Sequence, residues 1–74
     1  MALYGVVLVH TTAAAMRGEA VLNRAGIAVK LVPVPRNLSS DCGLAIRFAS
    51  ADRERVVDTL ARERIDTAGI YDLG

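Results

Sequence analysis

The residues of this chain that could do chemistry are concentrated in residues 33–48, PVPRNLSSDCGLAIRF. This stretch carries both prolines, two adjacent serines and Cys42, which is the only cysteine of the chain. A cysteine thiolate is a nucleophile when its surroundings lower the thiol pKa and leave the sulfur accessible. Ser39 and Ser40 could donate hydrogen bonds to an anion, and Arg36 could hold an anionic group of a substrate or an acidic partner.

Each of these residues also has an ordinary structural interpretation. A lone cysteine in a small domain is often a buried apolar side chain. Adjacent serines commonly form turns that bond their own backbone. Arg36 can be solvated or can pair with Asp41, and His10 can end a strand in solvent. The residue types alone therefore leave open whether Cys42 is a reactive thiol or a core residue.

Length and composition limit what the chain can be. Residues 1–74 make one domain, and a chain that is 53% hydrophobic with one Phe and no Trp must build its core from aliphatic side chains. The mean hydropathy of +0.34 indicates apolar surface that is buried against a partner. A net charge of +1 argues against nucleic acid and against a polybasic membrane contact.

The cysteine count and the apolar runs bear on location. One cysteine cannot form an intramolecular disulfide or a multi-thiolate metal site, and it is typical of a reducing cytoplasm. The apolar run in residues 3–9 has no basic residue before it, so we interpret it as a strand rather than a signal peptide. No stretch approaches the roughly 20 apolar residues that a membrane span needs.

The first half of the chain predicts a strand, a helix and a second strand. Residues 3–9 are apolar on both faces, as in a central strand. Residues 13–25 are helical, with a threonine at the N-cap and Gly26 in the left-handed position that ends many helices. Residues 28–34 form a second strand, which the prolines place at a sheet edge. The expected buried face of the helix consists of Ala14, Gly18, Val21, Leu22 and Ala25.

The second half predicts a loop, a strand, a helix and a last strand. The loop of residues 35–41 is longer than an ordinary hairpin turn, and such loops often carry function. Residues 44–48 alternate, with Leu44, Ile46 and Phe48 on one apolar face. Ser50 is the expected N-cap of a helix over residues 51–64, and residues 67–71 form the fourth strand. The expected buried stripe of this helix is Val56, Val57, Leu60 and Ala61.

The element order β-α-β-β-α-β predicts an α+β, ferredoxin-like fold with both helices on one face of a four-stranded antiparallel sheet of order 4-1-3-2. Its central strands run in opposite directions, so the start of the third lies beside the end of the first and the start of the first helix. We therefore expect Cys42 to lie near His10, Thr11 and Thr12, with the Arg36 loop above it.

This placement has a chemical consequence for the thiol. A helix N-terminus carries unpaired N–H groups and about half a positive charge, which stabilises a thiolate relative to a thiol. Asp41 acts in the opposite direction, because a neighbouring negative charge raises a thiol pKa. Gly43 places no side chain beside the sulfur. Strand alternation puts Cys42 on the face of Leu44, Ile46 and Phe48, the face that the helices cover.

The same stretch also resembles the central motif of a family of short proteins described as selenium/sulfur-carrier-like. The motif P-x-P-R-x-L-S-S-x-C-G-L-A-I-R-F is present in residues 33–48, and the resemblance extends over nearly the whole chain. It implies a carrier that uses Cys42 as a persulfide or selenopersulfide acceptor, without a cofactor or bound metal. The implied partners are a donor protein such as a cysteine desulfurase and an acceptor protein.

The residues also allow a second function. The alternative is a ligand- or protein-binding module that uses Arg36, Ser39 and Ser40, with Cys42 structural. Dedicated catalysis is not expected, because paired carboxylates and a recognisable triad are missing. An RNA-recognition domain needs aromatic residues on its central strands, and a metallochaperone needs a Cys-x-x-Cys loop where His10 to Ala13 stand. The apolar helix-free face of the sheet predicts a homodimer.

Overall fold

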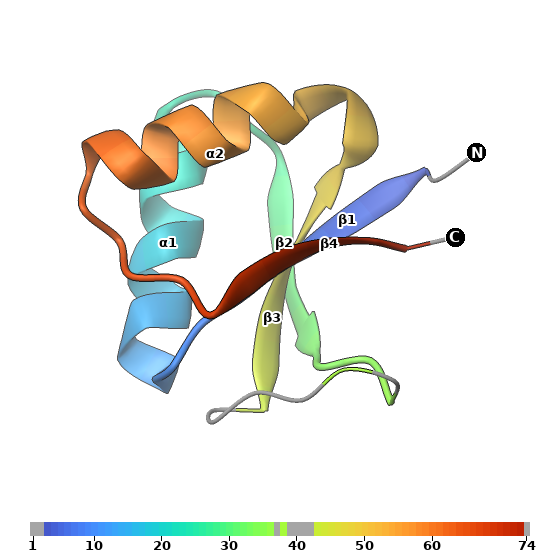
Figure 1. The fold of residues 1–74 in the computed structure, drawn as a ribbon. Coiled ribbons are helices and arrows are strands. Elements are labelled where there is room, and N and C mark those ends of the chain that lie inside the picture. Colours follow the sequence, from blue (N-terminus) through green and yellow to red (C-terminus); the bar gives the residue numbers. More distant parts are fainter. Residues whose placement is uncertain (1–2, 37, 39–42, 74) are drawn as a thin grey trace.

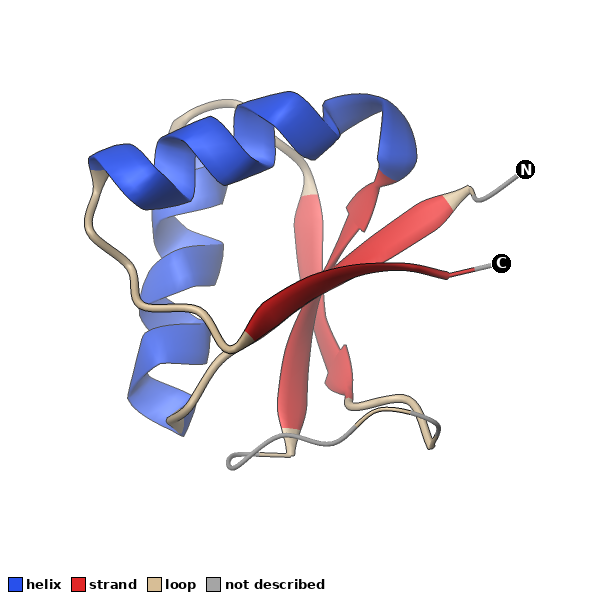
Figure 2. Cartoon of the chain, in the orientation of Figure 1, coloured by secondary structure: helices blue, strands red, loops and turns tan. Residues whose placement is uncertain are grey.

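The computed structural model describes residues 3–36, 38 and 43–73, which form one four-stranded sheet and two α-helices (Figure 1, Figure 2). The sheet has the order β2-β3-β1-β4, and each neighbouring pair is antiparallel. This confirms the predicted α+β class and strand order, read from the opposite edge. In chain order the elements are β1 (Tyr4–Leu8), α1 (Thr12–Arg24), β2 (Val29–Pro33), β3 (Leu44–Ala49), a 3-10 turn η1 (Ser50–Asp52), α2 (Arg53–Arg62) and β4 (Gly69–Leu73).

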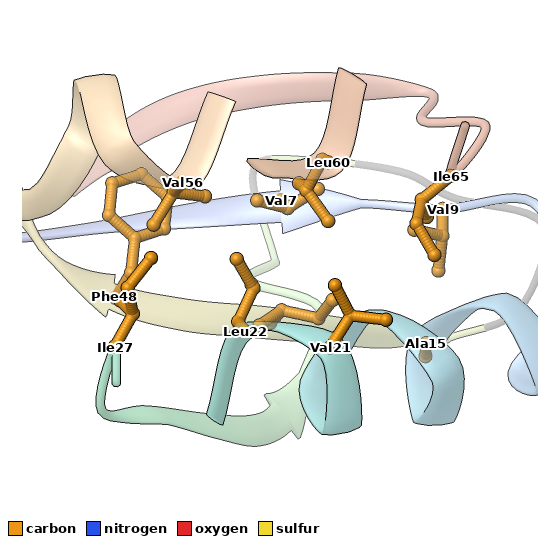
Figure 3. Close-up of a cluster of buried hydrophobic side chains, with 11 residues drawn as sticks. Val7, Val9, Ala15, Val21, Leu22, Ile27, Phe48, Val56, Leu60 and Ile65 are labelled. Atoms are coloured by element: carbon orange, nitrogen blue, oxygen red, sulfur yellow. The ribbon is translucent and has the colours of Figure 1, made fainter. Parts of the chain in front are cut away.

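Both helices cover the same face of the sheet (Figure 1). Buried side chains of α1 and α2 form one hydrophobic cluster with Val7 and Phe48 of the central strands (Figure 3). Ile46 of β3 belongs to the same cluster. Removing these side chains from water is the main favourable contribution to the stability of a domain of this size. The cluster consists of Val7, Val9, Ala15, Val21, Leu22, Ile27, Ile46, Phe48, Val56, Leu60 and Ile65.

The central position of β1 explains why it is apolar on both faces. Val7 faces the helices, while Val6 and Leu8 face the opposite side, and all three are at most 2% exposed. On that opposite face, Val6, Leu8 and Ala45 form a second buried cluster. Leu38, from the loop after β2, packs against this cluster together with Val32, Val34 and Leu73. The loop therefore helps to cover the face that has no helix.

The first helix begins and ends as its sequence predicts. Thr11 is the N-cap, and its Oγ1 accepts a hydrogen bond of 3.0 Å from the backbone N–H of Ala14. At the other end Gly26 has a φ of +84° and donates to Asn23, while Ile27 donates to Leu22. These two bonds are the pair that closes a Schellman motif.

The buried face of α1 differs from the prediction at two positions. Ala15 is buried and Ala14 only partly so, and Ala25 is exposed because it lies beyond the last helical turn. Gly18 is buried as expected. A Cβ at Gly18 would lie 2.7 Å from Cδ1 of Ile46, so the absence of a side chain lets α1 approach the sheet closely.

The second helix is shorter than residues 51–64. Ser50 begins the 3-10 turn instead of capping α2, and its Oγ is buried with no hydrogen-bond partner in the part of the chain that is described. The predicted stripe was half wrong: Val56 and Leu60 are buried, but Val57 is 41% exposed and Ala61 is exposed. The reason is that α2 lies over α1 and the end of β3, and one narrow i, i+4 stripe suffices for this contact.

The strands differ from their predicted ranges only at their ends, except for β4. That strand occupies Gly69–Leu73 rather than residues 67–71, because its register on β1 runs from Leu8 opposite Gly69 to Tyr4 opposite Leu73. Asp72, an unusual residue for a strand, is accommodated by a 2.6 Å ion pair with Arg53 at the start of α2. The second strand is at an edge of the sheet, as its proline predicted.

Candidate functional site

The chain segments of the predicted site meet at one end of the sheet. β1 ends at Leu8, which lies opposite Ala45 near the start of β3, so the segment after β1 and the segment before β3 leave the sheet together. The segment after β1 leads within three residues to Thr11, the N-cap of α1. The start of β3 therefore lies beside the end of β1, as the topology predicts. The start of β3 and the N-terminus of α1 both lie at the lower end of the molecule in Figure 1.

Three of the predicted site residues join β1 to α1. His10, Thr11 and Thr12 are all exposed, and Thr12 is the first residue of the helix. Because the lone pair of the Thr11 hydroxyl accepts from Ala14, its proton can be donated to a neighbouring acceptor. The unpaired N–H groups of the first helical turn point toward the same end, as in every α-helix. This end of α1 therefore favours negative charge.

Gly43 closes the loop between β2 and β3. Its carbonyl accepts a hydrogen bond of 3.1 Å from the N–H of Val34, which extends the β2–β3 ladder one pair beyond Pro33 and Leu44. Gly43 has a φ of +75°, and among the described residues, apart from its neighbours in the chain, no heavy atom lies within 4 Å of the place where a Cβ would stand. Glycine is therefore favoured here by the backbone conformation.

The left-handed conformation of Gly43 affects one prediction about Cys42. Leu44, Ile46 and Phe48 do share the face that the helices cover. The alternation of side chains depends on extended backbone, however, and it is interrupted at Gly43. The strand pattern therefore gives no orientation for Cys42. Ser39, Ser40 and Cys42 lie outside the described residues.

The described part of the loop after β2 is anchored to the sheet. Leu38 donates from its N–H to the carbonyl of Pro35 over 3.0 Å, and its side chain packs on Val6, Leu8 and Ala45. Arg36, between these two anchors, is exposed. Arg36 thus lies in the sequence between Pro35 and Leu38, the two residues that this backbone hydrogen bond joins.

Two arginines that the sequence analysis did not select lie near this end of α1. Arg17 and Arg64 line a surface depression together with Ala13 and Ala14 of the first helical turns, and Asp66 contributes one opposing charge. Arg64 has a φ of +56° and repeats at the end of α2 the motif that Gly26 forms at the end of α1. The sequence carries one signal for this role of Arg64: an isoleucine follows Arg64 after α2, just as an isoleucine follows Gly26 after α1.

The described residues offer no metal centre. Within residues 3–36, 38 and 43–73, no group of three or more His, Cys, Asp or Glu side chains could hold a metal ion. In the same part of the chain neither helix has the length and apolarity that a bilayer crossing requires.

The chain matches the model of a protein family. The model of the family described as "Putative Se/S carrier protein-like" matches residues 4–72, which include all four strands from their first residue and nearly all of the described structure. No curated protein and no solved structure matches the chain.

Proposed function

The chain belongs to this Se/S carrier protein-like family, and from that premise we propose that it carries sulfur or selenium on Cys42. The thiolate of Cys42 attacks the outer sulfur of a persulfide on a donor protein such as a cysteine desulfurase. The sulfur–sulfur bond of the donor breaks, the donor cysteine leaves as a thiolate, and Cys42 becomes the persulfide. A thiolate of the acceptor protein then attacks the outer sulfur on Cys42, and Cys42 leaves as a thiolate. Neither transfer consumes an oxidant or a reductant. Selenium follows the same route as a selenopersulfide.

One observation in the structure supports this proposal above the others. The antiparallel register of Leu8 with Ala45 brings Gly43, the neighbour of Cys42 in the sequence, to the end of the sheet where α1 begins. Partial positive charge at a helix N-terminus stabilises a thiolate. His10, Thr11 and Thr12 are the groups in that region that could bind the transferred anion.

Arg36, Ser39, Ser40 and Gly43 have supporting roles in the proposal. Arg36 is exposed on an anchored turn and can contact an acidic surface of the donor or acceptor. Ser39 and Ser40 can donate hydrogen bonds to the terminal sulfur or selenium. Gly43 adds no side chain of its own next to Cys42 in the sequence.

The proposal extends to the fold family and the compartment. We infer a ferredoxin-like fold, supported by the element order, the strand order and the single helix-covered face. A persulfide on a lone thiol needs a reducing compartment to avoid cross-linking, and the cytoplasm meets this requirement.

The first test is the pH dependence of alkylation of Cys42 in the folded protein, with the denatured chain as reference. If the helix end stabilises the thiolate, the pKa of Cys42 in the folded protein lies below the ordinary thiol value of about 8.5. Labelling should then be fast at neutral pH and slow down as the protein is denatured. Labelling that begins only on unfolding would show a buried thiol and contradict the carrier function.

Loading then separates the carrier from the binding module. The protein is incubated with a cysteine desulfurase and cysteine, and intact mass is measured. We expect one labile sulfur atom per chain in the wild type and none in Cys42→Ser, with unchanged circular dichroism. Two results together would favour a binding module that uses Arg36 and the serines. The wild type would take up no sulfur, and an anionic ligand would bind the wild type and Cys42→Ser equally.

A further inference from the structure

A depression on the helix-free face of the sheet lies at the end opposite Gly43. It encloses about 270 Å³ and is lined by the start of β1, the start of β2 and the end of β3. Ala28 and Ala49 contribute only methyl groups, whereas Tyr4, Lys30 and Arg47 contribute long side chains. In Figure 1 these strand ends lie at the upper end of the sheet. The depression is therefore separate from the candidate site at Cys42.

The charges in this depression are unbalanced. Lys30 of β2 lies directly opposite Arg47 of β3 in the ladder. Like charges in directly opposed positions destabilise a sheet. The ion pairs found among the described residues use Arg53, Arg55 and Arg62, and none reaches Lys30 or Arg47. Asp72, the one acidic residue in the four strands, is paired with Arg53.

The guanidinium N–H groups of Arg47 are available to bind a ligand. The centre of its guanidinium lies 4.7 Å from the ring centroid of Tyr4, which is a cation–π contact. A guanidinium that stacks through its face keeps the N–H groups at its edge directed outward. This planar fork matches two oxygens of a phosphate, and Tyr4 limits the number of orientations that the fork can take.

We propose that this depression binds the phosphate monoester group of a small ligand such as a mononucleotide, with Lys30 and Arg47 as its two cations. A phosphate monoester carries a charge of about −1.5 to −2 at neutral pH, which matches two cations, whereas one carboxylate matches only one. The methyl groups of Ala28 and Ala49 leave the space that the phosphate occupies, and the ring of Tyr4 contacts the rest of the ligand. Cys42 takes no part.

The test is a titration of isotopically labelled protein, followed by amide chemical shifts. The probes are AMP, adenosine and inorganic phosphate. We expect AMP to shift the amides of Tyr4, Lys30, Arg47 and Ala49, adenosine to shift none of them, and inorganic phosphate to compete with AMP. Phosphate that binds as tightly as AMP would support the same site with free phosphate as its ligand. Adenosine that binds as well as AMP, or shifts absent from these amides, would overturn the proposal.

Variants that change a charge but should remain folded separate a loss of AMP binding from a loss of structure. Lys30→Glu places a carboxylate opposite Arg47, so an ion pair replaces the like-charge pair. We expect AMP binding at least tenfold weaker, with a thermal midpoint equal to or above that of the wild type. Arg24→Glu makes the same change of net charge on exposed surface of α1 and should bind AMP like the wild type. Equal losses in both variants would show unspecific attraction and overturn the site. Cys42→Ser should bind AMP normally, so failure of the carrier function leaves this proposal standing.

Discussion

Each of the two helices is followed by one residue in the left-handed backbone conformation, and this residue ends the helix. Both helices end in the same pair of hydrogen bonds, and in both an isoleucine follows the left-handed residue and packs into the core. After α1 that left-handed residue is Gly26, but after α2 it is Arg64, with a φ of +56°. A residue with a Cβ pays about 1–2 kcal/mol for this conformation, whereas glycine does not. The chain thus retains a less stable residue at this position.

We predict that Arg64→Gly stabilises the folded protein by about 1 kcal/mol, because glycine removes the steric cost of the left-handed conformation. The free energy of unfolding in urea, measured by circular dichroism, gives the value. Arg62→Gly is the matched control, since Arg62 lies two residues earlier, within the last turn of α2. It should destabilise by about 1 kcal/mol through helix propensity. Equal effects of the two variants would contradict the assigned role of the Arg64 backbone.

At the scale of the elements, the contact between α1 and the sheet determines where the N-terminus of α1 lies. Gly18 faces Ile46 on β3, and α1 is close enough that even a Cβ would need Ile46 to move. The same helix is capped by Thr11, three residues after the end of β1. The close packing of α1 on β3 at Gly18 therefore also fixes where the N-terminus of α1 lies.

We predict that Gly18→Val destabilises the protein by about 1–3 kcal/mol, the usual cost of forcing extra methyl groups into a packed core. The measurement is the urea midpoint together with the slope of the transition. Ala20→Val is the control, because Ala20 is on the same helix but exposed. The control should lose only the small helix propensity of a β-branched residue, a few tenths of a kcal/mol. If Gly18→Val were as stable as Ala20→Val, α1 would not be held as closely as described.

At the scale of the whole molecule, the helix-free face is less open than its sequence indicated. Val6, Leu8 and Ala45, whose apolar character motivated the prediction of a homodimer, are already buried within one chain. Leu38 from the loop after β2 contributes to this burial. What remains exposed on this face includes Tyr71 of β4, at 42%. Homodimerisation stays a prediction, and we now expect the contact to form through the exposed side chains near β4.

A homodimer of this kind would place Tyr71 at the contact and leave the Lys30–Arg47 depression, near the opposite edge, accessible. Sedimentation velocity at high micromolar concentration should then show a dimer for the wild type and a monomer for Tyr71→Glu. Val57→Glu, which changes an exposed apolar residue on the helical side, should remain a dimer. A wild-type protein that sediments as a monomer would contradict the prediction.

Much of the fold and part of the site follow from local sequence pattern. The order of strands and helices, the apolar faces of β1 and β3, the edge position of the proline-containing β2 and the cap at Gly26 were all predictable. The meeting of the end of β1 with the start of β3 also follows, because it depends only on the topology. The predicted site residues Ser39, Ser40 and Cys42 lie outside the described part of the chain, so their placement stays a prediction.

Other features were decided only by tertiary structure. Val57 and Val56 are the same residue type, and only the narrow contact of α2 with α1 and β3 makes one exposed and the other buried. The pairing of Lys30 with Arg47 depends on the exact β2–β3 register, and the packing of Leu38 against the cluster of Val6, Leu8 and Ala45 depends on the tertiary position of Leu38. Side-chain periodicity is a property of neighbouring residues in the chain. Register, coverage and charge pairing are properties of residues that are distant in sequence, and they exist only once the sheet has assembled.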